Sequence, residues 1–116
     1  MAEHTGRCHC GAVQFKVDLD LKKLMTCNCS ICGRTGSIMA FVPGTALEQT
    51  AGQSEQTDYQ FGAKKIHHLF CTTCGVQSYG YGQDGKSNYM YMINLNCLEG
   101  FDTSTLTVTE FDGASL

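Results

Sequence analysis

Seven of the eight cysteines in this 116-residue chain lie in three short runs whose spacing suits metal binding. The runs are Cys8-His9-Cys10, Cys27-Asn28-Cys29-Ser30-Ile31-Cys32 and Cys71-Thr72-Thr73-Cys74. A Cys-x-x-Cys spacing brings two thiolates within reach of one small cation, and tetrahedral zinc sites are commonly built from such pairs. Three runs in one chain therefore predict zinc binding far more strongly than a single run would.

The spacing divides these cysteines into two metal sites, of which the first is closed. Pairing Cys8 and Cys10 with Cys71 and Cys74 gives a four-cysteine site, here called the first cluster. Zinc sites with four protein ligands are structural. A glycine follows the last cysteine of each pair, and a backbone that tolerates positive φ there can turn its N–H groups toward the thiolates.

Cys27, Cys29 and Cys32, here called the second cluster, could hold another zinc and leave one position for water or substrate. An open position is typical of catalytic zinc. Three thiolates on a dication leave a net charge near minus one, which makes the zinc a weak Lewis acid suited to a soft sulfur ligand. The second cluster therefore favours thiol chemistry over hydrolysis. The alternative is a closed structural site whose fourth ligand is Cys97, His9, His67 or His68.

Composition and charge limit the kinds of partner and the cellular compartment that we expect for this chain. The net charge is −3 with neutral histidines, which predicts no nucleic-acid partner because phosphates require a basic surface. No apolar run approaches the roughly 20 residues of a spanning helix, so we expect no membrane insertion. The first residues have no signal-peptide pattern, which predicts a reducing, cytoplasmic location where thiols bind metals rather than form disulfides.

The rest of the pattern predicts one mostly β domain over residues 1–116, with antiparallel sheets and zinc at their corners. The best helical candidate is a single turn at residues 30–34. Alternating or apolar segments between glycine-rich turns predict strands at residues 12–17, 38–42, 57–61, 66–70, 89–95 and 103–111. His67 and His68 are neighbours in one of these strands, so their rings should point to opposite faces.

Three stretches resemble the glutathione-dependent formaldehyde-activating enzyme family in order and spacing across nearly the whole chain. They are Gly6-Arg7-Cys8-His9-Cys10-Gly11-Ala12-Val13, Cys27-Asn28-Cys29-Ser30-Ile31-Cys32 and Phe70-Cys71-Thr72-Thr73-Cys74-Gly75. Residues 27–32, 74–78, 97–98 and 110–113 look most like the branch that includes centromere protein V. The resemblance implies a zinc-binding β-tent fold, a structural zinc on the first cluster and a second zinc on the second cluster.

The resemblance also implies carbon–sulfur lyase chemistry on S-hydroxymethylglutathione or a related thiol adduct. In this hypothesis the catalytic residues are Cys27, Cys29 and Cys32, whose zinc would bind the substrate thiol. A nearby group would move the hydroxyl proton, and His67, His68 and Tyr79 are unranked candidates. The alternative is a non-catalytic zinc-binding module that presents a β surface to a protein partner.

Overall fold

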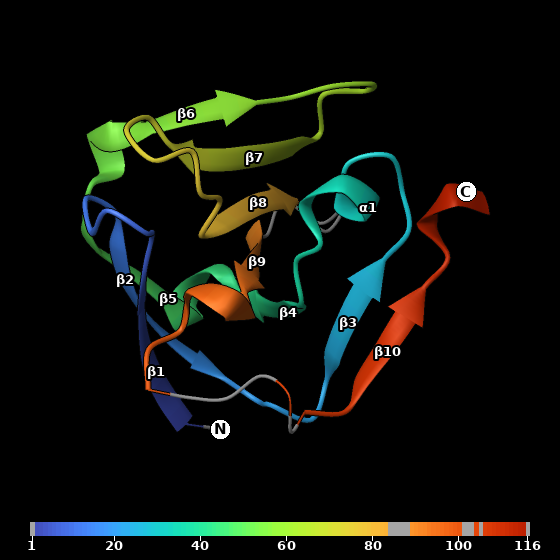
Figure 1. Cartoon of the computed structure of the whole chain (residues 1–116), viewed down its shortest axis with the longest axis horizontal. Coiled ribbons are helices and arrows are strands. Elements are labelled where there is room, and N and C mark those ends of the chain that lie inside the picture. The colour runs from blue at the N-terminus through green and yellow to red at the C-terminus, as the bar shows by residue number, and fades with distance from the viewer. Residues whose placement is uncertain (1, 84–88, 101–103, 105, 116) are drawn as a thin grey trace.

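The computed structural model describes residues 2–83, 89–100, 104 and 106–115, which form two β-sheets (Figure 1). The smaller sheet is antiparallel and has the order β1-β2-β5. Its strands are β1 (Ala2–Arg7), β2 (Gln14–Leu19) and β5 (Leu47–Ala51).

The larger sheet has the order β10-β3-β4-β9-β8-β7-β6. All its described pairings are antiparallel except that of β10 with β3, which is parallel. The strands are β3 (Leu24–Cys27), β4 (Met39–Pro43), β6 (Gln56–Tyr59), β7 (Ile66–Cys71), β8 (Tyr79–Gln83), β9 (Tyr89–Asn94) and β10 (Val108–Phe111).

Short helical turns connect these strands. The α-helix α1 (Cys32–Thr35) comes four residues after β3, and it ends at Gly36, which has the left-handed conformation common at helix C-termini. The 3₁₀ turns are η1 (Gly44–Ala46), η2 (Gln53–Glu55), η3 (Leu95–Cys97) and η5 (Gly113–Ser115). Within the described residues, no helix is both long enough and apolar enough to cross a membrane.

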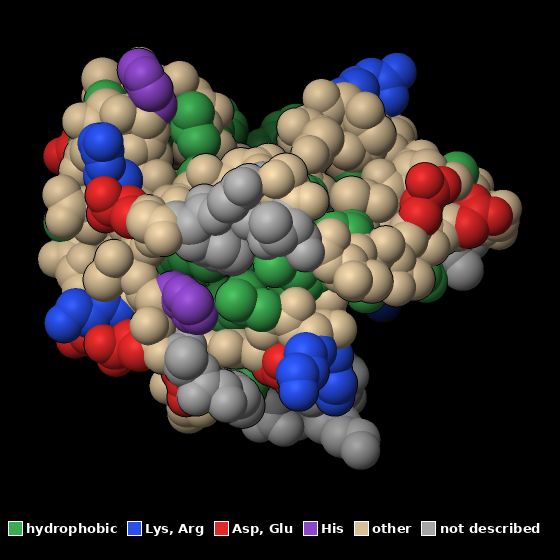
Figure 2. Space-filling view, turned by 60° about the horizontal axis from the view of Figure 1, so that its bottom comes forward, with side chains coloured by type: hydrophobic (Ala, Val, Ile, Leu, Met, Phe, Trp, Pro, Cys, Tyr) green, Lys and Arg blue, Asp and Glu red, His purple; other side chains and the backbone are tan. Residues whose placement is uncertain are grey.

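The hydrophobic core lies between the two sheets. Along β2 every second residue is buried, so Phe15, Val17 and Leu19 face inward while their neighbours face solvent. The ring of Phe15 meets the ring of Tyr79 from β8 edge-on, with centroids 5.4 Å apart. On the face seen in Figure 2, apolar side chains gather near the middle beside a histidine, and most Lys, Arg, Asp and Glu side chains lie farther out.

The predicted mostly β fold is confirmed, with some shifts in the elements. The expected strands 38–42, 57–61, 66–70 and 89–95 match β4, β6, β7 and β9 within about two residues, and the expected helical turn matches α1. The strand expected at 12–17 begins two residues later. Residues 103 and 105 of the expected strand 103–111 lie outside the described residues, and β10 covers its last part. Strands β1, β3, β5 and β8 were not predicted.

Candidate metal centres

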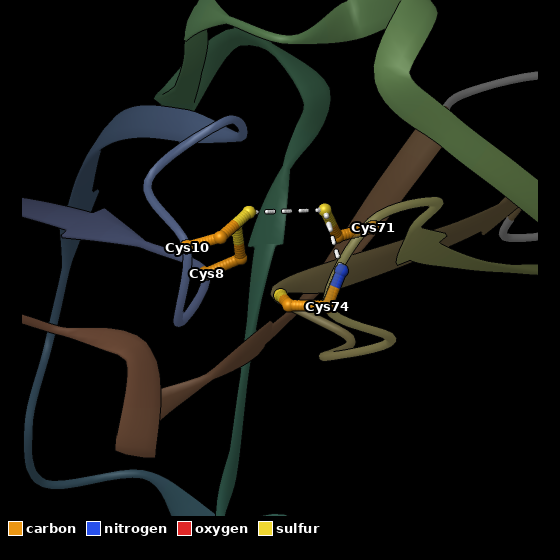
Figure 3. Close-up of side chains that lie close together, drawn as sticks. All are labelled: Cys8, Cys10, Cys71 and Cys74. Atoms are coloured by element: carbon orange, nitrogen blue, oxygen red, sulfur yellow. Dashed lines mark hydrogen bonds between the residues drawn. The ribbon is translucent and has the colours of Figure 1, made fainter.

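The first cluster joins the two sheets (Figure 3). Cys8 and Cys10 follow β1 of the smaller sheet, whereas Cys71 ends β7 of the larger sheet and Cys74 lies in the turn after it. The four Sγ atoms all lie within 4.8 Å of one another, with 3.7 Å between Cys8 and Cys10 and 3.6 Å between Cys10 and Cys71. Tetrahedral zinc with Zn–S bonds near 2.3 Å requires sulfurs about 3.8 Å apart. The spacing therefore fits a four-cysteine metal site.

The backbone around the first cluster donates N–H groups to the sulfurs. The N–H of Val13 lies 3.4 Å from the Sγ of Cys8, and that of Cys74 lies 3.5 Å from the Sγ of Cys71. Gly11 and Gly75 take positive φ values of 84° and 78°, as the sequence predicted for the turns of such knuckles. The pKa of Cys74 is lowered to about 6, mainly because the backbone N–H groups of Cys10 and Val76 stabilise its thiolate.

The second cluster is built from one short segment. Cys27 is the last residue of β3, Cys32 is the first of α1, and the three Sγ atoms lie within 4.8 Å of one another. The N–H of Cys29 points at the Sγ of Cys27, and the N–H of Cys32 points at the Sγ of Cys29, each at 3.4 Å. Among the described residues, no fourth Cys, His, Asp or Glu joins the three at this distance.

The second cluster is electrostatically suited to a cation. Burial and the neighbouring thiols of Cys29 and Cys27 together raise the pKa of Cys32 to about 12. Burial also acts to raise the pKa of Cys29, but hydrogen bonds from Cys32 outweigh it, so that pKa is lowered. Negative charge on one thiolate of the cluster therefore makes it harder to ionise the next thiol. A bound dication would remove this opposition.

The C-terminal turn packs directly against the second cluster. Strand β10 runs beside β3, with Phe111 opposite Cys27. The side-chain nitrogen of Asn28 donates to Asp112 Oδ1, and its oxygen accepts from the N–H of Ala114, each at 2.9 Å. A Cβ added at Gly113 would lie 2.5 Å from the Sγ of Cys27. The sequence predicted no role for residues 111–114, although residues 110–113 are part of the family resemblance.

An apolar pocket of about 480 Å³ adjoins the second cluster, and all three of its cysteines line it. Methionines from three strands, His68, Ile31 and Gly113 contribute to the wall, and four large, exposed apolar side chains complete it. Among the described residues, no Lys, Arg, Asp or Glu lines this pocket. The four large apolar side chains are Phe41, Phe61, Ile66 and Phe111.

The three candidate proton carriers lie in different environments. His68 is buried, its ring stacks on that of Phe61 with centroids 5.5 Å apart, and it lines the apolar pocket. Burial lowers its pKa, so its imidazole is neutral at neutral pH. Tyr79 lies in the core, where burial raises its pKa to about 12 and its hydroxyl donates to the side-chain oxygen of Gln56.

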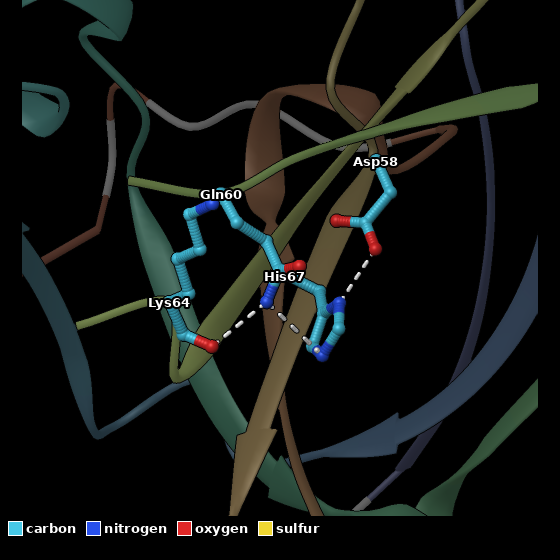
Figure 4. A network of polar contacts seen from close by, with 4 residues as sticks. All are labelled: Asp58, Gln60, Lys64 and His67. Carbon is cyan, nitrogen blue, oxygen red and sulfur yellow. Dashed lines mark hydrogen bonds and ion pairs between the residues drawn. The ribbon is translucent and has the colours of Figure 1, made fainter. Parts of the chain in front are cut away.

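His67 faces the other side of the sheet, as the alternation predicted. Its Nδ1 lies 2.6 Å from Asp58 Oδ2, and its Nε2 lies 3.5 Å from the side-chain nitrogen of Gln60, which donates to the carbonyl oxygen of Lys64 (Figure 4). Its ring also stacks on Tyr81, with centroids 4.3 Å apart. Of the three candidates, His68 alone lines the apolar pocket, while His68 and Tyr79 both line a smaller cavity that also reaches Cys32.

None of the four residues proposed as a fourth ligand, Cys97, His9, His67 and His68, joins the second cluster within 4.8 Å. Cys97 is buried, and its Sγ lies 3.9 Å from the carbonyl oxygen of Gln77. Burial raises its pKa, and negative charge on Cys8 and Cys74 raises it further, which reflects its nearness to the first cluster. His9 stands between two residues of the first cluster and is exposed.

Three comparisons relate the chain to known proteins. A family model described as glutathione-dependent formaldehyde-activating enzyme matches residues 3–110. An uncharacterized lyase of Schizosaccharomyces pombe is 26% identical over 107 residues, which cover 90% of this chain and 75% of that protein. A crystal structure of a Rhodobacter sphaeroides protein is 34% identical and superposes with a TM-score of 0.83, over 92% of this chain and 99% of the other.

Proposed function

The chain belongs to the glutathione-dependent formaldehyde-activating enzyme family, and we propose that it is a zinc-dependent carbon–sulfur lyase acting on a hemithioacetal-type thiol adduct. The proposal rests mainly on the second cluster. Its three thiols have no fourth protein ligand among the described residues, and they line a pocket large enough for a small molecule. Kinship with a protein named as a lyase supports the same reaction class.

We assign the first cluster to a structural zinc and the second to a catalytic zinc. Both sulfur sets fit, since thiolates are preferred zinc ligands and both groups have the compactness that tetrahedral coordination requires. Bound to the second cluster, zinc would supply a position that favours a substrate sulfur as thiolate. The backbone N–H groups of Cys29 and Cys32, which point at the Sγ atoms of Cys27 and Cys29, would stabilise the ligand thiolates themselves.

His68 is our choice for the proton carrier, because it is a neutral imidazole in the wall of the same pocket. In cleavage, the adduct's hydroxyl proton would pass to this ring while the C–S electron pair moves to sulfur, so that a carbonyl compound and a thiolate form. The ring then passes its proton to the thiolate, a neutral thiol leaves, and the reverse sequence forms the adduct. The apolar walls would keep water away from the carbonyl product.

The test compares two cysteine variants of the full chain. Cys29→Ser should bind one zinc fewer per chain, because a ligand of the reacting site is gone. Its rate of hemithioacetal breakdown should fall at least about a hundredfold. Cys97→Ser is the matched control, since this buried thiol belongs to neither cluster. Zinc is measured by elemental analysis and the rate by trapping the released aldehyde.

Two results would overturn the proposal. Full activity and full zinc content in Cys29→Ser would remove the second cluster from the reaction. Absence of activity in the parent chain, with a zinc that no thiol perturbs, would favour the non-catalytic module that presents its surface to a protein.

A further inference from the structure

We propose that the adduct taken by this chain carries an apolar substituent on its sulfur, and that the second cluster discriminates against glutathione. This inference rests on the proposed lyase function and specifies its substrate class. It follows from what lines the pocket beside the second cluster and from where the charged side chains of the molecule lie.

The pocket offers an apolar surface to whatever is joined to the substrate sulfur. Its volume of about 480 Å³ lies within the range of small-molecule sites. Most large apolar side chains of folded proteins are buried, yet four of those lining this pocket are substantially exposed, and their clustering makes an apolar mouth. Their exposed fractions are 43% for Phe41, 41% for Phe61, 46% for Ile66 and 45% for Phe111.

Glutathione is a poor match for this pocket because it carries two carboxylates and one ammonium group. Placing a carboxylate against apolar side chains without a partner charge is costly. Lys64 and Lys65 could have served as partners, but they line a separate hollow together with His67. No cation among the described residues lines the pocket itself.

Two charged side chains, Arg34 and Asp112, lie close to the pocket in the sequence or in space but do not line it. Arg34 borders an adjoining hollow, where its guanidinium donates to the carbonyl oxygen of Ser30 at 2.7 Å. Asp112 precedes Gly113, which lines the pocket, and its carboxylate accepts hydrogen bonds from Asn28 and Ser115. Three thiolates on one zinc leave a net charge near minus one. A neutral apolar thiol avoids both repulsion and desolvation of charge.

The experiment uses two thiols that differ by one carboxylate, phenylmethanethiol and 4-(mercaptomethyl)benzoate, with glutathione as the third ligand. The full chain is loaded with Co²⁺ in place of zinc, and sulfur-to-cobalt charge-transfer absorption is followed during titration. The closed first cluster should not respond. We expect phenylmethanethiol to saturate the spectral change at a concentration at least tenfold lower than either carboxylate-bearing thiol.

The outcomes separate this inference from the function on which it rests. If glutathione binds as tightly as phenylmethanethiol, the substrate class is wrong while thiol binding at the second cluster stands. If glutathione binds tightly to the parent chain but weakly to Arg34→Gln, Arg34 in the adjoining hollow recognises glutathione. That result would also overturn the inference. If no thiol changes the spectrum, both the lyase proposal and this inference are wrong.

A charge placed at the pocket mouth gives an independent check. Ile66→Lys adds a cation to the lining, so we expect it to reduce the tenfold preference by at least threefold, chiefly through tighter binding of the benzoate thiol. Thr50→Lys adds the same charge at an exposed position of β5 in the smaller sheet, and it should leave the preference unchanged. Equal effects of the two variants would show that the thiols bind outside this pocket.

Discussion

The two cysteine clusters use the same ligand atom in opposite structural contexts. The first cluster combines residues about sixty positions apart and ties β1 of one sheet to β7 of the other. The second is contained in one short segment at the end of β3, and an apolar pocket opens beside it. Residue type therefore identifies both as candidate metal sites, but only their surroundings distinguish a site that holds the fold together from one that can meet a substrate.

The largest expected effect comes from breaking the first cluster. Cys71→Ser should abolish the cooperative thermal unfolding transition or lower its midpoint by more than about 15 °C, because metal binding at a site that joins two sheets is part of the folding free energy. Cys29→Ser should shift the midpoint by less than about 5 °C. Circular dichroism melts of both metal-loaded variants measure the difference.

Equal destabilisation by these two variants would contradict the division of roles between the clusters. A Cys97→Ser melt shows what loss of a buried thiol costs when no metal ligand is removed.

A smaller effect should follow from adding one methyl group at Gly113. Its Cβ would lie 2.5 Å from the Sγ of Cys27 and 3.1 Å from the Cβ of Cys29, so the turn or the thiol must move. We expect Gly113→Ala to weaken metal binding at the second cluster about tenfold, or about 1.4 kcal/mol, with the first unchanged. Competition with a chromogenic chelator measures both affinities.

Gly33→Ala is the matched control for this substitution. A Cβ at Gly33 would lie 3.8 Å from its nearest neighbour, the carbonyl oxygen of Asn28, which is ordinary contact. If both alanine variants weakened the second cluster equally, helix and loop flexibility rather than the close packing of the C-terminal turn would explain the loss.

The two groups of neighbouring sulfurs were predictable because the cysteines of a candidate metal site lie close together in short runs of the sequence. Cys-x-x-Cys spacing predicted both groups of sulfurs, and the glycines after Cys10 and Cys74 predicted the positive φ values. The unpredicted β8 contains Gly80 and Gly82, which favour turns locally. Cross-strand pairing with β7 and β9 overrides that preference.

The pocket could not be predicted in the same way, since its wall is assembled from distant strands. Met25, Met39 and Met92 come from β3, β4 and β9, and they become neighbours only through the strand order. The parallel pairing of β10 with β3 is equally non-local, so no period in the sequence placed Gly113 against Cys27.

A still smaller effect is expected from releasing the C-terminal turn without touching the sulfurs. Asn28→Ala removes the two side-chain hydrogen bonds to Asp112 and Ala114, each worth about 1 kcal/mol. Amide hydrogen exchange at residues 112–115 should rise several-fold, while metal content stays complete. Asn96→Ala, at another exposed asparagine, should leave exchange there unchanged. Unaltered exchange in Asn28→Ala would mean that the pairing of β10 with β3 alone fixes the turn.

The smallest effect concerns His68, on the pocket side of this comparison. Burial lowers its pKa in the folded chain below the ordinary value of 6.5. At a pH between the lowered pKa and 6.5, the unfolded chain therefore binds a proton at this residue that the folded chain does not. The free energy of unfolding therefore falls as pH drops through this window, and the contribution is fully present above pH 6.5. His68→Phe keeps a ring against Phe61 and removes the titration. The metal-loaded variant should lose less stability than the parent between pH 7.5 and 5.5 in denaturant titrations. Acid protonation of the cysteine thiolates acts on both proteins and cancels in the difference, so equal losses would show that His68 is protonated equally in the folded and unfolded states.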